Sequence, residues 1–382
     1  MSVLLTGADG YLGWPTALRL ADRLDERVIC VDNFARREWV AESGSVSATR
    51  IEEPEDRFES VENLSLIEGD LADRDFVIQL LDTHEPDTVL HAASQPSAPY
   101  SSINGERALY TQRNNISMNL NLLHGLHECG LDETHFIETT TTGIYGAPHF
   151  PIPEGGLSVG REGGSDDVPF PAMGGSWYHQ TKSFDAANMR LAESQFEFPM
   201  SEVRTAIVYG TETDETCAHD SPTRFDFDYY FGTVVNRFCA QAVAGYPITV
   251  YGKGEQRKPM VSLEDTVESL VRLVEEGHSG DDRIEIYNQV TRPVAIVELA
   301  ETIAEVGAEF DLDAEVKHYE NPRNEDEEHK MKMENERFLE LVGGQRQELE
   351  AGIRDVLGTL VEEQDRIAAH EDRFLPGVLT DE

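Results

Sequence analysis

The first residues of the chain decide its fold and read SVLLTGADGYLG at positions 2–13. Residues 2–5 are apolar and predict a buried strand, and the three glycines that follow predict a tight turn. Leucines at helical spacing come next, and residues 28–31 predict a second buried strand that ends at Asp32. The order strand, glycine-rich turn, helix, strand and acid is typical of dinucleotide-binding folds.

The same stretch predicts which dinucleotide binds. The glycines allow a pyrophosphate to approach the helix N-terminus, where free backbone N–H groups favour anions. Asp32 lies about 20 residues further on, where a carboxylate binds the ribose 2′-hydroxyl of NAD and repels the 2′-phosphate of NADP. We therefore expect NAD. Arg36 and Arg37 keep NADP open as an alternative, because arginines near that acid can hold a 2′-phosphate.

Strands and helices continue to alternate up to about residue 210. The expected strands are 63–67, 88–93 and 135–139, and the expected helices are 76–81, 107–129 and 177–191. Residues 147–176 are rich in Gly and Pro and predict a loop over the site. Residues 345–371 predict an exposed acidic helix.

We therefore predict an α/β fold with a Rossmann-type doubly wound parallel sheet and a smaller, mixed C-terminal substrate lobe. Residues 1–210 are expected to form the NAD-binding domain, and residues 211–382 mainly the substrate lobe. Segments near 231–247 and 262–290 are expected to return to the first domain.

A second motif, YHQTK, occupies residues 178–182. The chain has only six lysines in 382 residues, and Lys182 is the first of them. Positions i and i+4 share a helix face, so the Tyr178 phenol and the Lys182 ammonium are expected to meet at one site. The ammonium would lower the phenol pKa and make a base for a sugar hydroxyl while hydride leaves the carbon. The alternative is an aromatic and a cation that merely pack on a helix surface.

The charge balance limits the possible partners. The chain has 73 acidic against 31 basic residues, a net charge of −42. Such a surface repels nucleic acid and anionic membranes, so neither is expected as a partner. The acid excess and the preference for Arg over Lys indicate a high-salt cytoplasm, where screening makes the self-repulsion tolerable.

Cysteines, histidines and hydropathy complete this picture. Four scattered cysteines (Cys30, Cys129, Cys217 and Cys239) predict reduced thiols. The sequence shows neither a signal peptide nor an apolar run of membrane-spanning length, which predicts a cytoplasmic protein. His124 and His127 are too few for a metal site and are expected at a helix interface, so no metal is predicted.

Several further strings are uncommon outside one group of enzymes. They are DGYLGW (9–14), VDN with RR (31–37), SAPYS (97–101), RALYTQRNN (107–115), YGTETDET (209–216), FGT with NRFC (231–239), TVYGKG (249–254) and NPR with EEH (321–329). Over residues 1–335 the chain resembles the UDP-sulfoquinovose synthases, which are extended short-chain dehydrogenases/reductases of the NAD-dependent epimerase/dehydratase superfamily. By its acidic composition it would be a halophilic member.

The resemblance implies a reaction in which NAD stays bound. UDP-glucose and sulfite would become UDP-sulfoquinovose through 4-keto and 4-keto-5-ene intermediates. Tyr178, supported by Lys182, would take the C4 hydroxyl proton. Thr141 would bind the reacting sugar oxygen, or else be a strand-end threonine bonded to backbone. His179 would shuttle protons at C6, or else be a surface histidine.

The resemblance also assigns the site residue by residue. The expected catalytic residues are Thr141, Tyr178, Lys182 and His179. The expected cofactor-binding residues are Gly7, Gly10, Tyr11, Leu12, Gly13, Asp32, Asn33, Arg36, Arg37, Asp70, Leu71, Asn115, Tyr178 and Lys182. The expected substrate-binding residues are Arg107, Gln112, Thr141, Thr233, Arg237, Lys258 and Arg323. A homodimer is expected through helices 107–129 and 178–196, with Leu109, Met118, Leu122 and Leu126 in the interface.

Three positions depart from the family pattern. Ile144 stands where plant members have Glu, and Pro96 stands where they have Arg. Lys258 takes a family Arg position, with Arg257 displaced by one. The first two departures leave open a nucleotide-sugar 4-epimerase or dehydratase that does not use sulfite. A non-enzymatic NAD-sensing module is disfavoured, because such proteins commonly lose the Tyr or the Lys.

Overall fold

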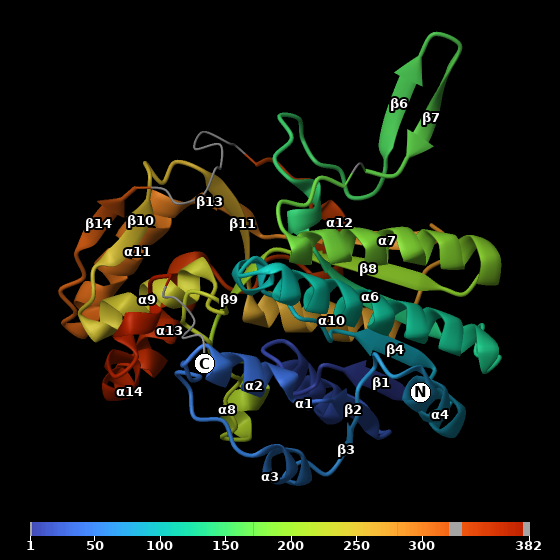
Figure 1. The fold of residues 1–382 in the computed structure, drawn as a ribbon, viewed down its shortest axis with the longest axis horizontal. Coiled ribbons are helices and arrows are strands. Elements are labelled where there is room, and N and C mark those ends of the chain that lie inside the picture. Colours follow the sequence, from blue (N-terminus) through green and yellow to red (C-terminus); the bar gives the residue numbers. More distant parts are fainter. Residues whose placement is uncertain (1, 171, 281, 321–330, 377–382) are drawn as a thin grey trace.

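A parallel seven-stranded sheet forms the centre of the structure (Figure 1). The computed structural model describes residues 2–170, 172–280, 282–320 and 331–376. The strand order is β12-β8-β5-β4-β1-β2-β3. The strands are β1 (Val3–Thr6), β2 (Val28–Asp32), β3 (Leu64–Glu68), β4 (Thr88–His91), β5 (His135–Thr141), β8 (Met200–Thr205) and β12 (Ile284–Gln289). The central strands β1 and β4 are buried along their whole length, as expected where helices cover both faces.

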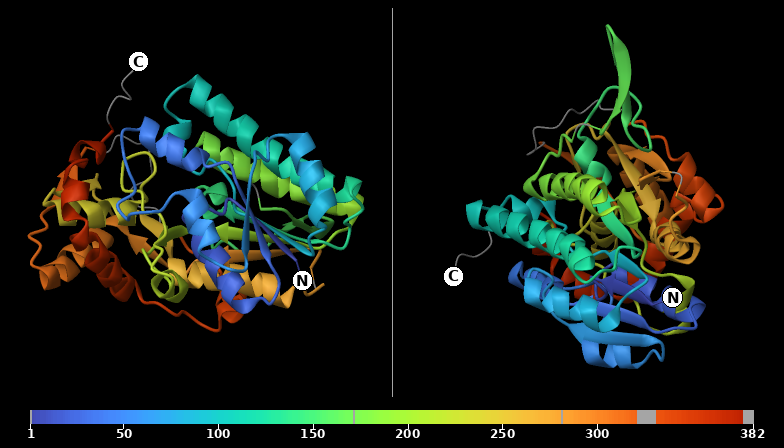
Figure 2. Two further views of the ribbon diagram at one scale, coloured as in Figure 1. Left: turned by 90° about the horizontal axis from the view of Figure 1, so that it is seen from below. Right: turned by 90° about the vertical axis from the view of Figure 1, so that its right-hand side faces the viewer.

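Helices pack on both faces of this sheet, as the views in Figure 2 show. One face carries α1 (Gly13–Arg23), α10 (Leu263–Glu276) and α12 (Glu336–Val342), whose apolar side chains form one core with the sheet. The other face carries α4 (Arg74–His84), α6 (Gly105–Glu128) and α7 (Trp177–Phe196), which form a second core. The predicted doubly wound Rossmann-type fold is confirmed.

A smaller lobe has its own core and its own short sheets. Its strands are β9 (Ile207–Tyr209), β11 (Arg257–Ser262) and β13 (Arg292–Ala295) in one sheet, and β10 (Ile248–Tyr251) and β14 (Val316–Tyr319) in another. Its helices are α9 (Val234–Ala244), α11 (Ile296–Gly307), α13 (Leu349–Glu362) and α14 (Gln364–Ala368).

The chain crosses between the two parts more than once. Strand β12 pairs in parallel with β8 and closes one edge of the central sheet, so residues 284–289 lie in the first part of the structure. Helix α10 packs on α1 in the same part. The expectation for residues 231–247 is wrong, because α9 packs among α11, α13 and α14 in the smaller core.

Two other expectations fail because of local structure. Residues 147–176 are not simply a loop, since β6 (Leu157–Arg161) and β7 (Gly164–Val168) form a hairpin that projects from the body (Figure 1). Residues 345–371 are not an exposed helix. They contain α13 and α14, and α13 buries Ile353, Val356 and Leu357 completely in the smaller core.

The remaining elements are short. They are α2 (Ala35–Glu42), α3 (Pro54–Glu59), α5 (Ala98–Ser101) and α8 (Asp214–Ala218), with 3₁₀ turns at Thr142–Tyr145, Ala308–Phe310 and Glu371–Arg373. No helix of the described residues is long and apolar enough to cross a membrane.

Candidate active site

The glycine-rich turn between β1 and α1 leaves no room for side chains. Gly7 has a φ of +75°, and a Cβ there would lie 2.7 Å from the backbone nitrogen of Ala93. A Cβ on Gly13 would lie 2.0 Å from the carbonyl oxygen of Gly7. The turn therefore brings backbone against the start of α1, which is the cradle that a pyrophosphate needs. These residues fit a dinucleotide.

Asp32 ends β2 beside this turn. Its Oδ2 accepts a hydrogen bond from the Asp9 backbone N–H (2.9 Å), and its Oδ1 accepts one from the Phe34 N–H (2.7 Å). Burial raises the pKa of Asp32, although both backbone bonds favour the ionised form. Its position at the pocket edge is the one that a ribose-binding acid requires.

Arg36 and Arg37, which left NADP as an alternative cofactor in the sequence analysis, are both paired with acids of this chain. Arg37 holds Asp9 through two hydrogen bonds of 2.7 and 2.9 Å. Arg36 lies 2.7 Å from Asp226 and sits 4.2 Å above the ring of Phe231. Both guanidinium groups are thus paired with acids of this chain, and Arg37 lies outside the described pocket lining, although Arg36 lines the pocket.

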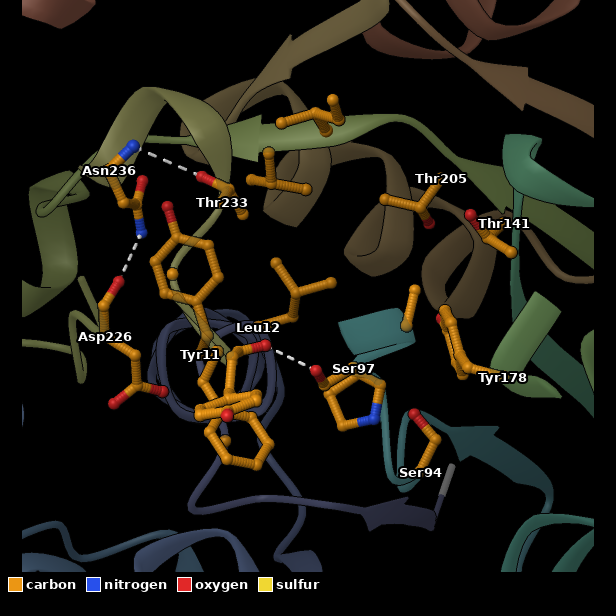
Figure 3. A pocket seen from close by; sticks show the side chains of 18 of the residues that line it. Tyr11, Leu12, Ser94, Ser97, Thr141, Tyr178, Thr205, Asp226, Thr233 and Asn236 are labelled. Carbon is orange, nitrogen blue, oxygen red and sulfur yellow. Dashed lines mark hydrogen bonds between the residues drawn. The ribbon is translucent and has the colours of Figure 1, made fainter. Parts of the chain in front are cut away.

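One large pocket begins at the glycine turn and runs between the two parts of the chain. Figure 3 shows Tyr178 and Thr141 on one side of it, Thr233 and Asn236 on the opposite side, and Tyr11 and Leu12 below Thr233 in this view. The pocket is also lined by Gly7, Gly10, Gly13, Asp32, Asn33, Arg36, Arg237 and Lys258. It therefore brings together most of the predicted cofactor residues and four of the seven predicted substrate residues.

Helix α7 presents Tyr178 to the pocket. The Ser176 hydroxyl caps the helix by accepting the His179 backbone N–H (3.1 Å), and the Ser101 hydroxyl accepts the Tyr178 N–H (3.3 Å). The charge of Lys182 acts on the phenol in the predicted direction, but the pKa of Tyr178 is raised overall. Burial raises the pKa of Tyr178, and the Lys182 charge opposes this shift without overcoming it.

Lys182 lies one helical turn behind Tyr178 and is almost completely buried, with 2% of its side chain exposed. Its Nζ is 2.9 Å from Glu138 Oε1 and 3.1 Å from Asp185 Oδ2. The reading of a surface cation is therefore wrong. The sequence analysis missed both acids, although Asp185 could have been found, because it lies three residues after Lys182 on the same helix face.

Thr141 and His179 each contact Gly143. Thr141 lines the pocket, and its Oγ1 also accepts the backbone N–H of Gly143 (3.1 Å), so it serves the backbone as well. The His179 ring covers Gly143, where a Cβ would lie 2.3 Å from the ring. His179 is half-buried and is not among the residues that line the pocket in the described chain.

Arg237 and Lys258 bring positive charge to the lining of the pocket. The Arg237 guanidinium lies 5.9 Å from the ring centre of Tyr229 and donates to the Gly232 carbonyl (3.3 Å). Lys258 lines the pocket, whereas Arg257 lies outside its described lining and pairs with Glu298 at 3.4 Å. The lysine, not the displaced arginine, therefore faces the pocket.

Several predicted residues lie outside the described lining of the pocket. Arg107 pairs with Glu42 (2.9 Å), and Gln112 donates to the Trp177 carbonyl (2.7 Å), so each ties α6 to a neighbouring element. Asn115 is buried and bonds the backbone of Gln95. Arg37, Asp70, Leu71 and Lys182 are also outside it. Arg323 falls in residues 321–330 and lies outside the described residues.

Ile144 and Pro96, the first two departures from the family pattern, have different surroundings. Ile144 is 4% exposed and packs with Tyr145, Ile152 and Phe170 in an apolar cluster. Pro96 lines the pocket itself. Neither position can supply a charge or a proton to a ligand.

The predicted interface role of two histidines is supported. The His127 ring stacks on Phe196 of α7 at 4.2 Å, and the His124 ring meets the same phenylalanine edge-on at 5.4 Å. Within the described residues, no group of three or more His, Cys, Asp or Glu side chains is placed to hold a metal.

This fold and site define the class of protein. The NAD dependent epimerase/dehydratase family matches residues 3–289, and the chain belongs to that family. NAD is therefore its cofactor, and the protein is an enzyme of this type. Among solved structures, the UDP-glucose 4-epimerase of Thermotoga maritima matches with a TM-score of 0.71 and 21% identity, covering 95% of this chain and 99% of that one.

Two relatives identify a narrower group within this family to which the chain belongs. The UDP-sulfoquinovose synthase of spinach chloroplasts is 35% identical over 346 residues, which cover 89% of this chain and 71% of the relative. The UDP-sulfoquinovose synthase of Sulfolobus acidocaldarius is 37% identical over 337 residues, which cover 86% and 84%. The chain is a member of the UDP-sulfoquinovose synthase group of that family.

Proposed function

We propose that the protein converts UDP-glucose and sulfite into UDP-sulfoquinovose and water. The observation that carries this proposal is the likeness to the two synthases over most of the chain, together with the arrangement of the pocket. Tyr178 and Thr141 line one side of the pocket, where a sugar would be oxidised. Arg237 and Lys258 also line it, and these two cations would hold a diphosphate.

The side chains divide the chemistry between them. NAD would supply the hydride acceptor for the first half of the reaction and the hydride donor for the second. Tyr178 would take the proton of the C4 hydroxyl as its base and return it at the end. Thr141 would donate a hydrogen bond to the C4 oxygen. The resulting ketone acidifies the C5 proton, so that water can leave from C6 and sulfite can add there.

A second candidate function is a nucleotide-sugar 4-epimerase or dehydratase that does not use sulfite. It is favoured by Ile144 and Pro96, because an apolar cluster and a proline replace the family's acid and cation. Mass spectrometry of products from UDP-glucose, with and without sulfite, separates the two functions. A product that gains a sulfonate only when sulfite is present supports the synthase, and UDP-galactose or a 4-keto sugar in both samples supports the alternative.

The protein is expected to purify with NAD bound. A cycle that reduces and reoxidises the same cofactor gains nothing from its release, and the glycine turn encloses the site closely. Denaturing the purified protein should therefore release about one dinucleotide per chain, measured by chromatography. Protein without any dinucleotide that still converts UDP-glucose unaided would contradict this expectation.

We propose a homodimer built on α6 and α7, in which Leu109 is the one residue of the expected set that is exposed. Met118, Leu122 and Leu126 are buried in the chain's own core. The exposed large apolar side chains on the two helices are Leu109, Leu120, Trp177, Phe184 and Leu191, with exposed fractions of 36–58%.

Leu191→Asp should shift the mass measured by light scattering in molar salt from a dimer to a monomer, because the substitution would bury a charge in the proposed interface. Val159→Asp, on the projecting hairpin β6–β7, is the matched control and should remain dimeric. A monomeric wild-type protein would contradict the assembly.

We also propose that the protein works in a salt-rich cytoplasm. With a net charge of −42, self-repulsion opposes folding at low ionic strength. Molar salt shortens the Debye length to about 3 Å and removes most of that repulsion. The thermal midpoint should therefore rise by at least about 5 °C between 0.1 and 2 M KCl. A midpoint that is flat or falls over this range would contradict the proposal.

A further inference from the structure

Behind Tyr178, one ammonium group faces two carboxylates in the interior. Lys182 Nζ lies 2.9 Å from Glu138 Oε1, on β5, and 3.1 Å from Asp185 Oδ2, on α7. The side chains of Lys182, Glu138 and Asp185 are 2%, 0% and 1% exposed. All three are therefore removed from water, and their charges are not screened by salt.

The two acids differ in their other contacts. Glu138 Oε2 accepts a hydrogen bond from Asn119 of α6 (3.2 Å), which itself accepts one from Asn188 of α7 (3.2 Å). Apart from the ion pair with Lys182, neither oxygen of Asp185 has a hydrogen-bond partner among the described residues. Glu138 is thus held on two sides, and Asp185 is held by the ammonium alone.

The surrounding charges do not balance the second acid. Glu202 of β8 forms an ion pair with Arg204 at 2.7 Å, and the charge of Arg190 on α7 also acts on it. The Glu202 charge does not balance Asp185, because it raises the pKa of Asp185 further. His91 of β4 lies 3.9 Å from Glu138, but burial, and then the Lys182 charge, lower the pKa of His91, which keeps it neutral. Two ionised acids beside one ammonium would leave a buried net charge of −1, which is costly in an apolar interior.

A shared proton removes that cost. Burial raises the pKa of Asp185 to about 7; the Lys182 ammonium opposes the shift, and the Glu138 charge adds to it. Burial also raises the pKa of Glu138. The acid pair therefore carries one proton below about pH 7 and loses it above, while Lys182 stays charged.

The same three charges act on the phenol of Tyr178. The Lys182 ammonium lowers the pKa of Tyr178, and the carboxylates of Asp185 and Glu138 raise it. Loss of the shared proton adds one negative charge near the phenol, so it opposes the ionisation of Tyr178.

We propose that Glu138 and Asp185 are positioning residues that hold the Lys182 ammonium behind Tyr178 and share one proton, and that loss of this proton restrains Tyr178 as a base. The proposal deepens, and rests on, the proposed role of Tyr178 in oxidising a sugar hydroxyl.

The first test is independent of turnover. Asp185→Asn keeps the shape of the side chain and removes its charge. An acid whose pKa is raised in the folded state favours folding below its unfolded pKa and loses that contribution as the pH rises, here between about 4 and 7. Relative to Asp185→Asn, wild type should therefore lose roughly 5 °C of thermal midpoint from pH 5 to pH 8. Asp82→Asn, on the exposed face of α4, is the control and should run parallel to wild type.

The second test measures the rate of UDP-glucose conversion against pH. Below about pH 7 the pair of wild type already carries its proton, so wild type and Asp185→Asn should follow the same profile there. Above pH 7 only wild type gains the second negative charge, so between pH 6 and pH 8 the rate of the variant should rise at least about threefold more than that of wild type. Glu138→Gln removes one charge of the same pair, should change the profile above pH 7 in the same direction, and replaces Asp185→Asn in the test if that variant does not fold. A purely structural role would lower the rate by the same factor at every pH.

The outcomes separate two failures. Superimposable pH profiles, or a midpoint difference that does not change with pH, would overturn the shared proton and its effect on Tyr178. Wild-type protein that does not convert UDP-glucose would overturn the proposed function alone, and the thermal measurement would then still decide whether the acid pair shares a proton.

Discussion

Tyr178→Phe is expected to fold and to bind NAD, and to convert UDP-glucose about 10²–10⁴ times more slowly than wild type. The substitution keeps the ring, which is half-buried at the end of the pocket, and removes only the oxygen that would take the C4 proton. Single-turnover conversion of UDP-glucose, followed by mass spectrometry, measures the loss.

A matched control comes from another part of the sheet. Tyr287→Phe removes a hydroxyl that bonds Glu285 (3.3 Å) in β12, outside the described pocket lining, and should leave the rate nearly unchanged. If Tyr178→Phe converted UDP-glucose at the wild-type rate, the base would have to be another residue.

Lys182→Met is expected to lose stability as well as activity. Removing one partner of a buried ion pair typically costs about 3–5 kcal/mol, because the remaining charge has no counterion. Here two carboxylates would be left, Glu138 and Asp185. Without the ammonium their pKa values rise further, so the variant should be weakest above pH 7 and should recover part of its stability relative to wild type towards pH 5.

Denaturant unfolding at pH 5 and pH 8 checks this result. Lys317→Met provides the comparison, since Lys317 pairs with Glu315 on the surface and its loss should leave the free energy of unfolding nearly unchanged at either pH. A variant Lys182→Met as stable as wild type at pH 8 would show that the two acids do not depend on the ammonium.

The Rossmann fold could be predicted because its signals are local. Buried parallel strands require continuous apolar runs, and the tight turn requires glycines. Both signals occur within residues 2–32. The pairing of Tyr178 and Lys182 on one helix face follows from the helical repeat in the same way.

What could not be predicted depends on contacts between distant segments. Arg37 binds Asp9, 28 residues earlier, and Arg36 binds Asp226, 190 residues later, so their engagement is invisible in the sequence. Met118 and Leu122 read as interface residues, but α4 and the sheet cover that face of α6. Their position on the helix does not reveal which side is covered.

The direction of the Tyr178 pKa shift could not be predicted from the sequence for the same reason. A sequence shows the ammonium of Lys182, but it does not show how deeply the phenol is buried or that Glu138 arrives from another strand. Burial and the two acids together outweigh the cation, and each of these effects is a property of the folded chain.

The position of β12 affects how the chain folds while it is being synthesised. Ribosomes add roughly 5–20 residues each second, and about 80 residues separate β8 from the strand that pairs with it, so β8 waits several seconds for its neighbour. During that wait, the six residues of β8 present unpaired backbone groups along a sheet edge, which invites association between nascent chains. A chain released after residue 210 should therefore aggregate, and a chaperone that shields this edge should be needed only until residue 289 has emerged.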